Sequence, residues 1–177
     1  NLLIWLPILG GIFVLLTGDD KRPDIARYLT LFTILLSLGL CVPLVSGFDT
    51  NTFAMQFLEE LPWMPSLGIN YSLGIDGLSL LLIVLSIFTN LIVVLATWTS
   101  INTRVSQYLA AFLVMQGLLV GVFSAMDAIV FYIFWEATLI PMYLIIGIWG
   151  SDNRVYAAIK FFLYTFLGSV LMLASFL

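Results

Sequence analysis

The sequence contains no histidine and a single cysteine, Cys41. An imidazole metal site, a cysteine-ligated iron–sulfur cluster and an internal disulfide are therefore excluded within these residues. Charged residues make up only 9% of the chain, while 62% of its residues are apolar. Soluble domains carry about 25% charged residues. With a mean hydropathy of +1.15, the chain is predicted to be an integral membrane protein without a metal, a cofactor or a redox centre of its own, and without a nucleic-acid partner.

Apolar stretches of about 20 residues are long enough to cross a bilayer as helices. The sequence predicts an all-α, polytopic membrane helix bundle in a single transmembrane domain, with spans at about residues 2–17, 28–46, 77–98, 108–124, 128–149 and 156–177. Because it starts without a methionine and stops inside an apolar run at Leu177, we expect a piece of a longer chain.

The one long connection, residues 48–75, contains turn-forming prolines and glycines, namely Pro62, Pro65, Gly68 and Gly74. Within it, residues 68–74 could form a short strand or hairpin on the membrane surface. Two acidic residues stand directly before spans, Asp76 and Asp127, and both positions are typical of helix N-caps.

The basic residues predict the orientation. Five of the six lie in the first, third and fifth connections, namely Lys21, Arg22, Arg27, Arg104 and Arg154. The second and fourth connections contain neither lysine nor arginine. Positively charged loops stay on the cytoplasmic side. The N-terminus and the 48–75 loop are therefore predicted to lie outside, on the periplasmic face of a bacterial inner membrane.

Glu136 lies near the middle of the fifth span, where a carboxylate is costly and usually has either a partner or a use. A helical period places it on one stripe with Ile129, Tyr132, Ile140, Tyr143 and Gly147. Pro141 has no backbone N–H, so the carbonyl of Ala137 loses its donor and could bind water. Glu136 is thus predicted either to carry protons or to be a buried acid paired for assembly.

Other polar residues inside the spans leave two interpretations open. Lys160 is about five residues into the sixth span and, by helical rise, about 8 Å nearer the inner surface than Glu136. It could extend its ammonium to that surface, or exchange charge with an acid or water. The third span aligns polar residues that include Asn90, and the fourth span contains Gln116. Packing between helices is favoured for these two, with lining of a proton channel as the alternative.

Three segments resemble a known family: GIDGLSLLLIVLS at 74–86, FYIFWEATLIPMYLIIGIWG at 131–150 and AAIKFFLYT at 157–165. In this order and spacing they are similar to the antiporter-like membrane subunits of respiratory NADH:quinone oxidoreductase (complex I), and most of all to subunit M, or subunit 4. The resemblance covers essentially the whole chain, as its N-terminal portion.

The resemblance implies a subunit of about fourteen helices that works with other membrane subunits of the complex. The FMN, the iron–sulfur clusters and the quinone are then expected on partner subunits, not on this chain. Glu136 matches the fifth-helix glutamate, which is implicated in proton translocation and expected to pair with a seventh-helix lysine beyond Leu177. Lys160 matches a sixth-helix lysine, to which we assign a supporting charge. Tyr132, Tyr143, Asn90 and Gln116 are candidates for lining the channel.

Three functions are therefore considered. The first is a proton-translocating subunit that couples electron transfer from NADH to quinone, on other subunits, to proton pumping. The second is a subunit of a multi-subunit cation/proton antiporter or a membrane-bound hydrogenase. The third is a scaffold in which Glu136 is only a paired assembly residue.

Overall fold

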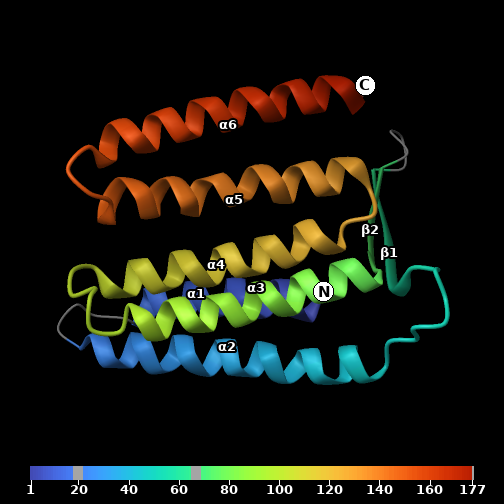
Figure 1. Cartoon of the computed structure of the whole chain (residues 1–177), viewed down its shortest axis with the longest axis horizontal. Helices are drawn as coiled ribbons and strands as arrows, with labels where there is room; N and C mark the ends of the chain where they lie inside the picture. The colour runs from blue at the N-terminus through green and yellow to red at the C-terminus, as the bar shows by residue number, and fades with distance from the viewer. Residues whose placement is uncertain (18–21, 65–68, 177) are drawn as a thin grey trace.

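A computed structural model describes residues 1–17, 22–64 and 69–176. Four residues used above, Lys21, Pro65, Gly68 and Leu177, lie outside this part of the chain. Within these described residues, the fold consists of six helices and one two-stranded sheet (Figure 1). Their bounds are α1 Leu2–Thr17, α2 Pro23–Ser46, β1 Gln56–Met64, β2 Ile69–Ile75, α3 Gly77–Ala96, α4 Val105–Ser124, α5 Ala128–Trp149 and α6 Arg154–Phe176.

Each predicted span overlaps one helix. In the part of the chain that the structure describes, five helices, α2 to α6, are long and apolar enough to cross a membrane, and α1 is a shorter apolar helix of 16 residues. The chain is therefore a multi-pass membrane protein. The largest difference in bounds is at α2, which begins at Pro23 rather than near Tyr28, because proline is favoured in the first turn of a helix.

Both predicted N-caps are confirmed. The Asp76 carboxylate accepts a hydrogen bond from the Ser79 backbone N–H at 2.7 Å. Asp127 accepts from the backbone N–H groups of Ile129 and Val130 at 2.8 and 3.2 Å. These bonds satisfy helix N–H groups that would otherwise have no partner, so they fix where α3 and α5 begin.

The long connection contains a β-hairpin, of which the sequence indicated only the second strand. β1 and β2 pair antiparallel, with register shifts on either side of the Glu59–Pro62 segment. Phe57, at the first shift, has a φ of 54°, which is typical of a bulge. The backbone N–H of Met126 donates to the Ser72 carbonyl at 2.9 Å, and this bond ties β2 to the α4–α5 connection.

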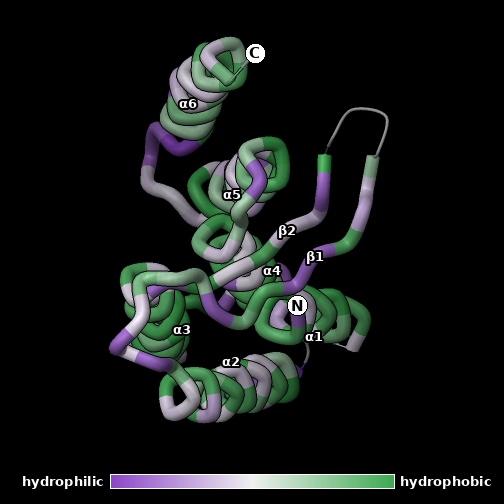
Figure 2. The backbone as a smooth tube through the Cα atoms, turned by 90° about the vertical axis from the view of Figure 1, so that its right-hand side faces the viewer, coloured by the Kyte–Doolittle hydropathy of each residue, from purple (hydrophilic) through white to green (hydrophobic). Residues whose placement is uncertain are grey.

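Helix α4 is the centre of the bundle. Twelve of its 20 residues are buried, and it contacts α1, α2, α3 and α5. Glycines bring its neighbours close: a β-carbon on Gly117 would lie 2.5 Å from the Ile4 carbonyl oxygen, and one on Gly121 would lie 2.5 Å from the Phe134 ring. Figure 2 shows α5 above α4 and α6 above α5, so α6 lies at the edge of the bundle.

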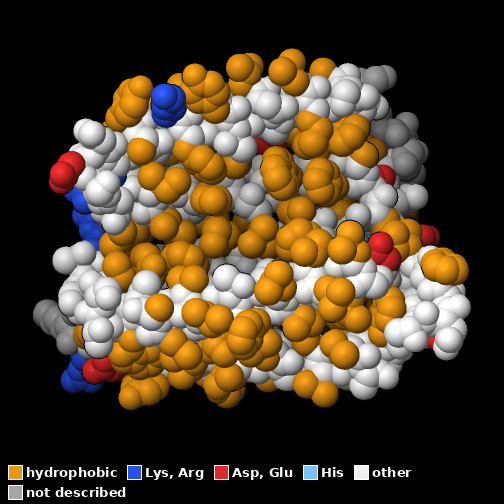
Figure 3. Space-filling model, in the orientation of Figure 1, with side chains coloured by type: hydrophobic (Ala, Val, Ile, Leu, Met, Phe, Trp, Pro, Cys, Tyr) orange, Lys and Arg blue, Asp and Glu red, His pale blue; other side chains and the backbone are white. Residues whose placement is uncertain are grey.

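The two ends of the bundle differ in charge. The hairpin and the starts of α3 and α5 share one end, at the right of Figure 1. The opposite end gathers most of the basic side chains, at the left of Figure 3. There, Arg27 donates to the Ile101 carbonyl at 3.1 Å, and the Trp149 indole N–H donates to the Thr103 carbonyl at 2.9 Å. Helices α2 and α5 thus hold the α3–α4 connection in place.

Candidate functional site

Glu136 is the ninth of the 22 residues of α5, so it lies in the interior of the helix and far from either end. Its side chain is partly buried, and its Oε1 atom is fully buried without a hydrogen-bond partner in the part of the chain that the structure describes. A buried carboxyl oxygen without a donor is unfavourable when ionised. This position therefore suits a group that gains a proton, a water molecule or a cation.

The stripe that contains Glu136 faces α6. The Tyr132 side chain lies beside both Glu136 and the buried Ser169 of α6. Two turns beyond Glu136 on the other side, the Tyr143 ring packs edge-on against Phe162 of α6, with centroids 5.7 Å apart. The acid thus lies between two tyrosines at the α5–α6 interface, as the helical period predicted.

Ile140 does not follow this stripe. Its side chain is 62% exposed and lines a groove between α1, α4 and α5 together with Pro141. Tyr132, Tyr143 and Gly147 of the predicted stripe lie against α6 together with Glu136, whereas Ile140 does not. Helical rotation of 100° per residue places Ile140 about 40° away from Glu136, which is enough to turn its side chain away from α6 and toward the groove beside α1 and α4.

Lys160 is not brought to Glu136. The α6 residues that pack on α5 are Ala158, Phe162 and Ser169, whereas Lys160 is exposed and lies on the opposite side of the helix. Its Nζ atom lies 5.7 Å from the Tyr156 ring centroid and 5.9 Å from that of Tyr164. The water link between Lys160 and Glu136 that we considered from the sequence would have to cross α6.

Asn90 and Gln116 form a separate polar position. Asn90 of α3 donates a short hydrogen bond to the Gln116 side chain of α4, and both residues are buried. The second polar atom of each amide has no partner among the described residues. The pair borders a mostly apolar groove of about 330 Å³ between α3 and α4. This bond is the interhelical packing contact that polar residues make inside membranes, and it lies away from Glu136, on the opposite side of α4.

One residue beside Tyr132 was not expected from the sequence, namely Ser169. It is buried, and its hydroxyl donates to the Phe166 carbonyl of its own helix at 2.9 Å. Ser169 is 37 positions from Tyr132 in the sequence, so no local pattern could indicate the contact; the pairing of α5 with α6 brings these two residues together. Within the described residues, no three His, Cys, Asp or Glu side chains are grouped so that they could hold a metal ion.

Comparison with known proteins gives a consistent result. Residues 125–177, which contain Glu136 and Lys160, match the transmembrane family described as NADH:quinone oxidoreductase/Mrp antiporter. NADH-quinone oxidoreductase subunit M of Rhodobacter capsulatus is 48% identical over 158 residues, which is 89% of this chain and 30% of the relative. F(420)H(2) dehydrogenase subunit M of Methanosarcina mazei is 41% identical over 98% of this chain and 34% of the relative.

A solved structure agrees with these relatives. A chain of respiratory complex I from Thermus thermophilus superposes on 98% of this chain with a TM-score of 0.82 and 32% sequence identity, over 34% of its own length. The chain spans about a third of the length of the curated relatives that it matches.

Proposed function

We propose that the chain is part of a proton-translocating subunit of complex I, because it matches the family described as NADH:quinone oxidoreductase/Mrp antiporter and is similar to subunit M and to a chain of respiratory complex I. In this proposal the chain crosses a bacterial inner membrane six times, with its N-terminus and hairpin outside. Electron transfer from NADH to quinone takes place on other subunits, which hold the FMN and iron–sulfur clusters and bind the quinone.

Glu136 is proposed as the group that takes up and releases the proton. The observation that carries this assignment is the buried Oε1 atom without a hydrogen-bond donor, in the middle of α5. Such a carboxyl responds strongly to a nearby charge, because little water screens the interaction. A cation that approaches would favour proton release, and its departure would favour uptake. The residues implied by the family place that cation on a later helix.

The remaining site residues are proposed to assist. Tyr132 and Tyr143 would line the proton path, because both face α6 on either side of Glu136. Asn90 and Gln116 would line a different part of the membrane interior, between α3 and α4. Lys160 is proposed to supply a supporting charge from the far side of α6, without contact to Glu136.

The test uses Glu136→Gln in the complete subunit within its purified complex, reconstituted into liposomes. Glutamine keeps the size of the side chain but cannot carry the proton. We expect NADH-driven quinone reduction and proton uptake both to fall about tenfold or more, since a lost proton-transfer group commonly costs at least that factor. Glu136→Asp, which keeps an acid, should retain part of both activities.

Thr138→Val is a matched control on the same helix. Thr138 is buried, and its hydroxyl donates only to the Trp135 carbonyl one turn earlier, so its loss should leave both activities within about twofold of wild type. If Glu136→Gln instead leaves both activities at the level of this control, the site assignment is wrong. If it prevents assembly but leaves the proton stoichiometry of assembled complexes unchanged, the scaffold function is the correct one.

The alternative function is a subunit of a cation/proton antiporter or a membrane-bound hydrogenase. This alternative is retained because the description of the matched family includes Mrp antiporters as well as NADH:quinone oxidoreductases. Subunits that carry FMN and iron–sulfur clusters should co-purify with a complex I subunit. A wild-type assembly without NADH oxidation would favour the alternative.

A further inference from the structure

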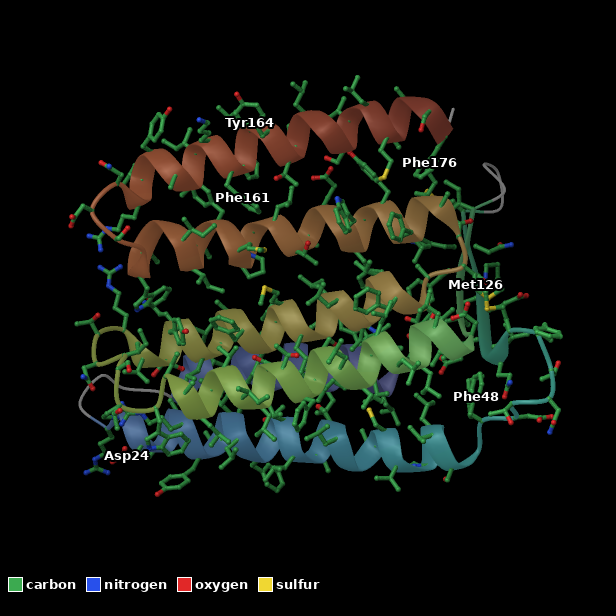
Figure 4. All side chains as sticks on the ribbon, in the orientation of Figure 1. Asp24, Phe48, Met126, Phe161, Tyr164 and Phe176 are labelled. Carbon is green, nitrogen blue, oxygen red and sulfur yellow. The ribbon has the colours of Figure 1, made fainter. Side chains whose placement is uncertain are left out.

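The outer face of α6 carries a positive charge inside the membrane. Lys160 is the seventh residue of α6, about 9 Å along the helix from its first residue at 1.5 Å per residue. Its neighbours on the same face, Tyr156 and Tyr164, are 67% and 70% exposed. Figure 4 shows Tyr164 on the side of α6 that points away from α5. In Figure 3 one blue side chain lies over α6, apart from the basic end and among hydrophobic side chains.

The ammonium does not extend to the membrane surface. A lysine that reaches toward the inner surface would pass Tyr156, which is one turn nearer to that surface, and would move away from Tyr164. The Nζ atom instead lies 5.7 Å from the Tyr156 ring centroid and 5.9 Å from the Tyr164 ring centroid. It therefore lies between the two aromatic rings, at about the same distance from each.

No carboxylate in the described part of the chain pairs with Lys160. The two ion pairs there join the N-terminus to Glu59 and Arg27 to Asp24, and Glu136 faces the other side of α6. A cation that faces lipid at this depth is unfavourable, and cations within membrane spans almost always face protein or water. Lipid phosphates lie at the level of the headgroups, too far from an ammonium held between Tyr156 and Tyr164.

We propose that the Tyr156–Lys160–Tyr164 face of α6 is an interface for a transmembrane helix that carries an aspartate or glutamate at the depth of Lys160. The carboxylate would accept hydrogen bonds from the ammonium, and the two tyrosine rings would shield the pair from lipid. Because the Lys160 ammonium is positive, the partner helix is identified by the negatively charged carboxylate that it carries. The proposal rests on the membrane location of α6 and not on proton transfer by Glu136, so either can fail without the other.

The experiment compares Lys160 variants in the complete subunit within its purified complex. Lys160→Met keeps the length of the side chain but removes the charge, whereas Lys160→Arg keeps the charge. Removing one partner of a buried ion pair is strongly destabilising, whereas removing a cation from a lipid-facing site is stabilising. We expect Lys160→Met to lower the midpoint of thermal unfolding by about 5 °C or more, and Lys160→Arg to restore most of it. Leu163→Met, on the exposed part of the same helix, is the control and should leave the midpoint unchanged.

A cross-link identifies the acid. Dicyclohexylcarbodiimide dissolves in membranes and activates a carboxyl group, which the Lys160 amine then attacks to form an amide. The cross-linked product has the mass of the two peptides minus one water. An amide to a membrane Asp or Glu supports the proposal. A Lys160→Met midpoint equal to or above wild type would overturn it, and so would a cross-link to Glu136 of the same chain.

Discussion

At Gly117, α1 and α4 pack backbone against backbone, and an alanine there tests how the bundle is held together. The added methyl group would lie 2.5 Å from the Ile4 carbonyl oxygen and 2.6 Å from Cγ1 of Ile8. Ordinary contact begins at 3.4 Å, so α1 would have to move away by about 0.9 Å. A gap of that size forfeits about a quarter to a half of each contact across it. Because overpacking costs about 1–3 kcal/mol, we expect Gly117→Ala to lower the free energy of unfolding by about 2 kcal/mol.

Gly39→Ala is the matched control. Gly39 is also inside a helix, α2, but a β-carbon there would meet nothing within 4 Å. Alanine should therefore raise stability by up to about 1 kcal/mol through helix propensity alone. The assay is unfolding of the full-length subunit in detergent, followed by circular dichroism for both variants in parallel. The two variants are expected to change the free energy of unfolding in opposite directions. If Gly117→Ala stabilises as much as Gly39→Ala, close packing of α1 on α4 does not determine the stability of this bundle.

Two further predictions concern the ends of the helices. Hydrogen bonds from Ser79 hold the pKa of Asp76 below its ordinary value of 3.8, so the stability gained from its charge is present above pH 3.8 and lost as the pH falls through the lower folded value. Thermal unfolding should therefore show Asp76→Asn less stable than wild type near neutral pH and equal to it in acid; a constant difference would contradict this. Arg27→Lys should cost about 1–2 kcal/mol, because it loses the bond to the Ile101 carbonyl. Asp24→Asn should cost only a few tenths of a kcal/mol, since the Asp24 side chain of the ion pair is 70% exposed. An equal loss in both variants would contradict the view that the bond from Arg27 to the Ile101 carbonyl stabilises the fold.

Hydropathy predicted the number and order of the helices, because length and apolar content decide whether a segment can cross a bilayer. It could not predict which helix lies at the centre. Helix α4 is the least hydropathic of the five long helices and yet the most buried. Inside a membrane, an apolar side chain has about the same free energy whether it faces lipid or protein, so hydropathy does not indicate which helix is central. Small residues such as Gly117 and Gly121 determine which helices pack closely.

The first strand of the hairpin was missed for a physical reason. β1 contains Glu59, Glu60 and Pro62, which interrupt the pattern expected of a strand. Proline is tolerated there because β1 has a single partner, so the missing N–H need not pair with a second strand. The pairing with β2 joins residues that are up to 19 positions apart, Gln56 and Ile75, and a local pattern carries no signal for such a contact.

The depths of Glu136 and Lys160 in the membrane do not determine whether their side chains can meet. Counting residues places Glu136 and Lys160 along the membrane normal, but only the packing of α5 on α6 shows that they lie on opposite sides of α6. Across a helix about 10 Å in diameter, two charges at an effective dielectric constant of about 20 interact by about 1–2 kcal/mol, against about 4 kcal/mol for a pair in contact. If Glu136 carries a proton, as proposed, Lys160 should therefore bias that proton without controlling it. The proposed role of Glu136 therefore predicts that Lys160→Met changes proton uptake far less than Glu136→Gln does.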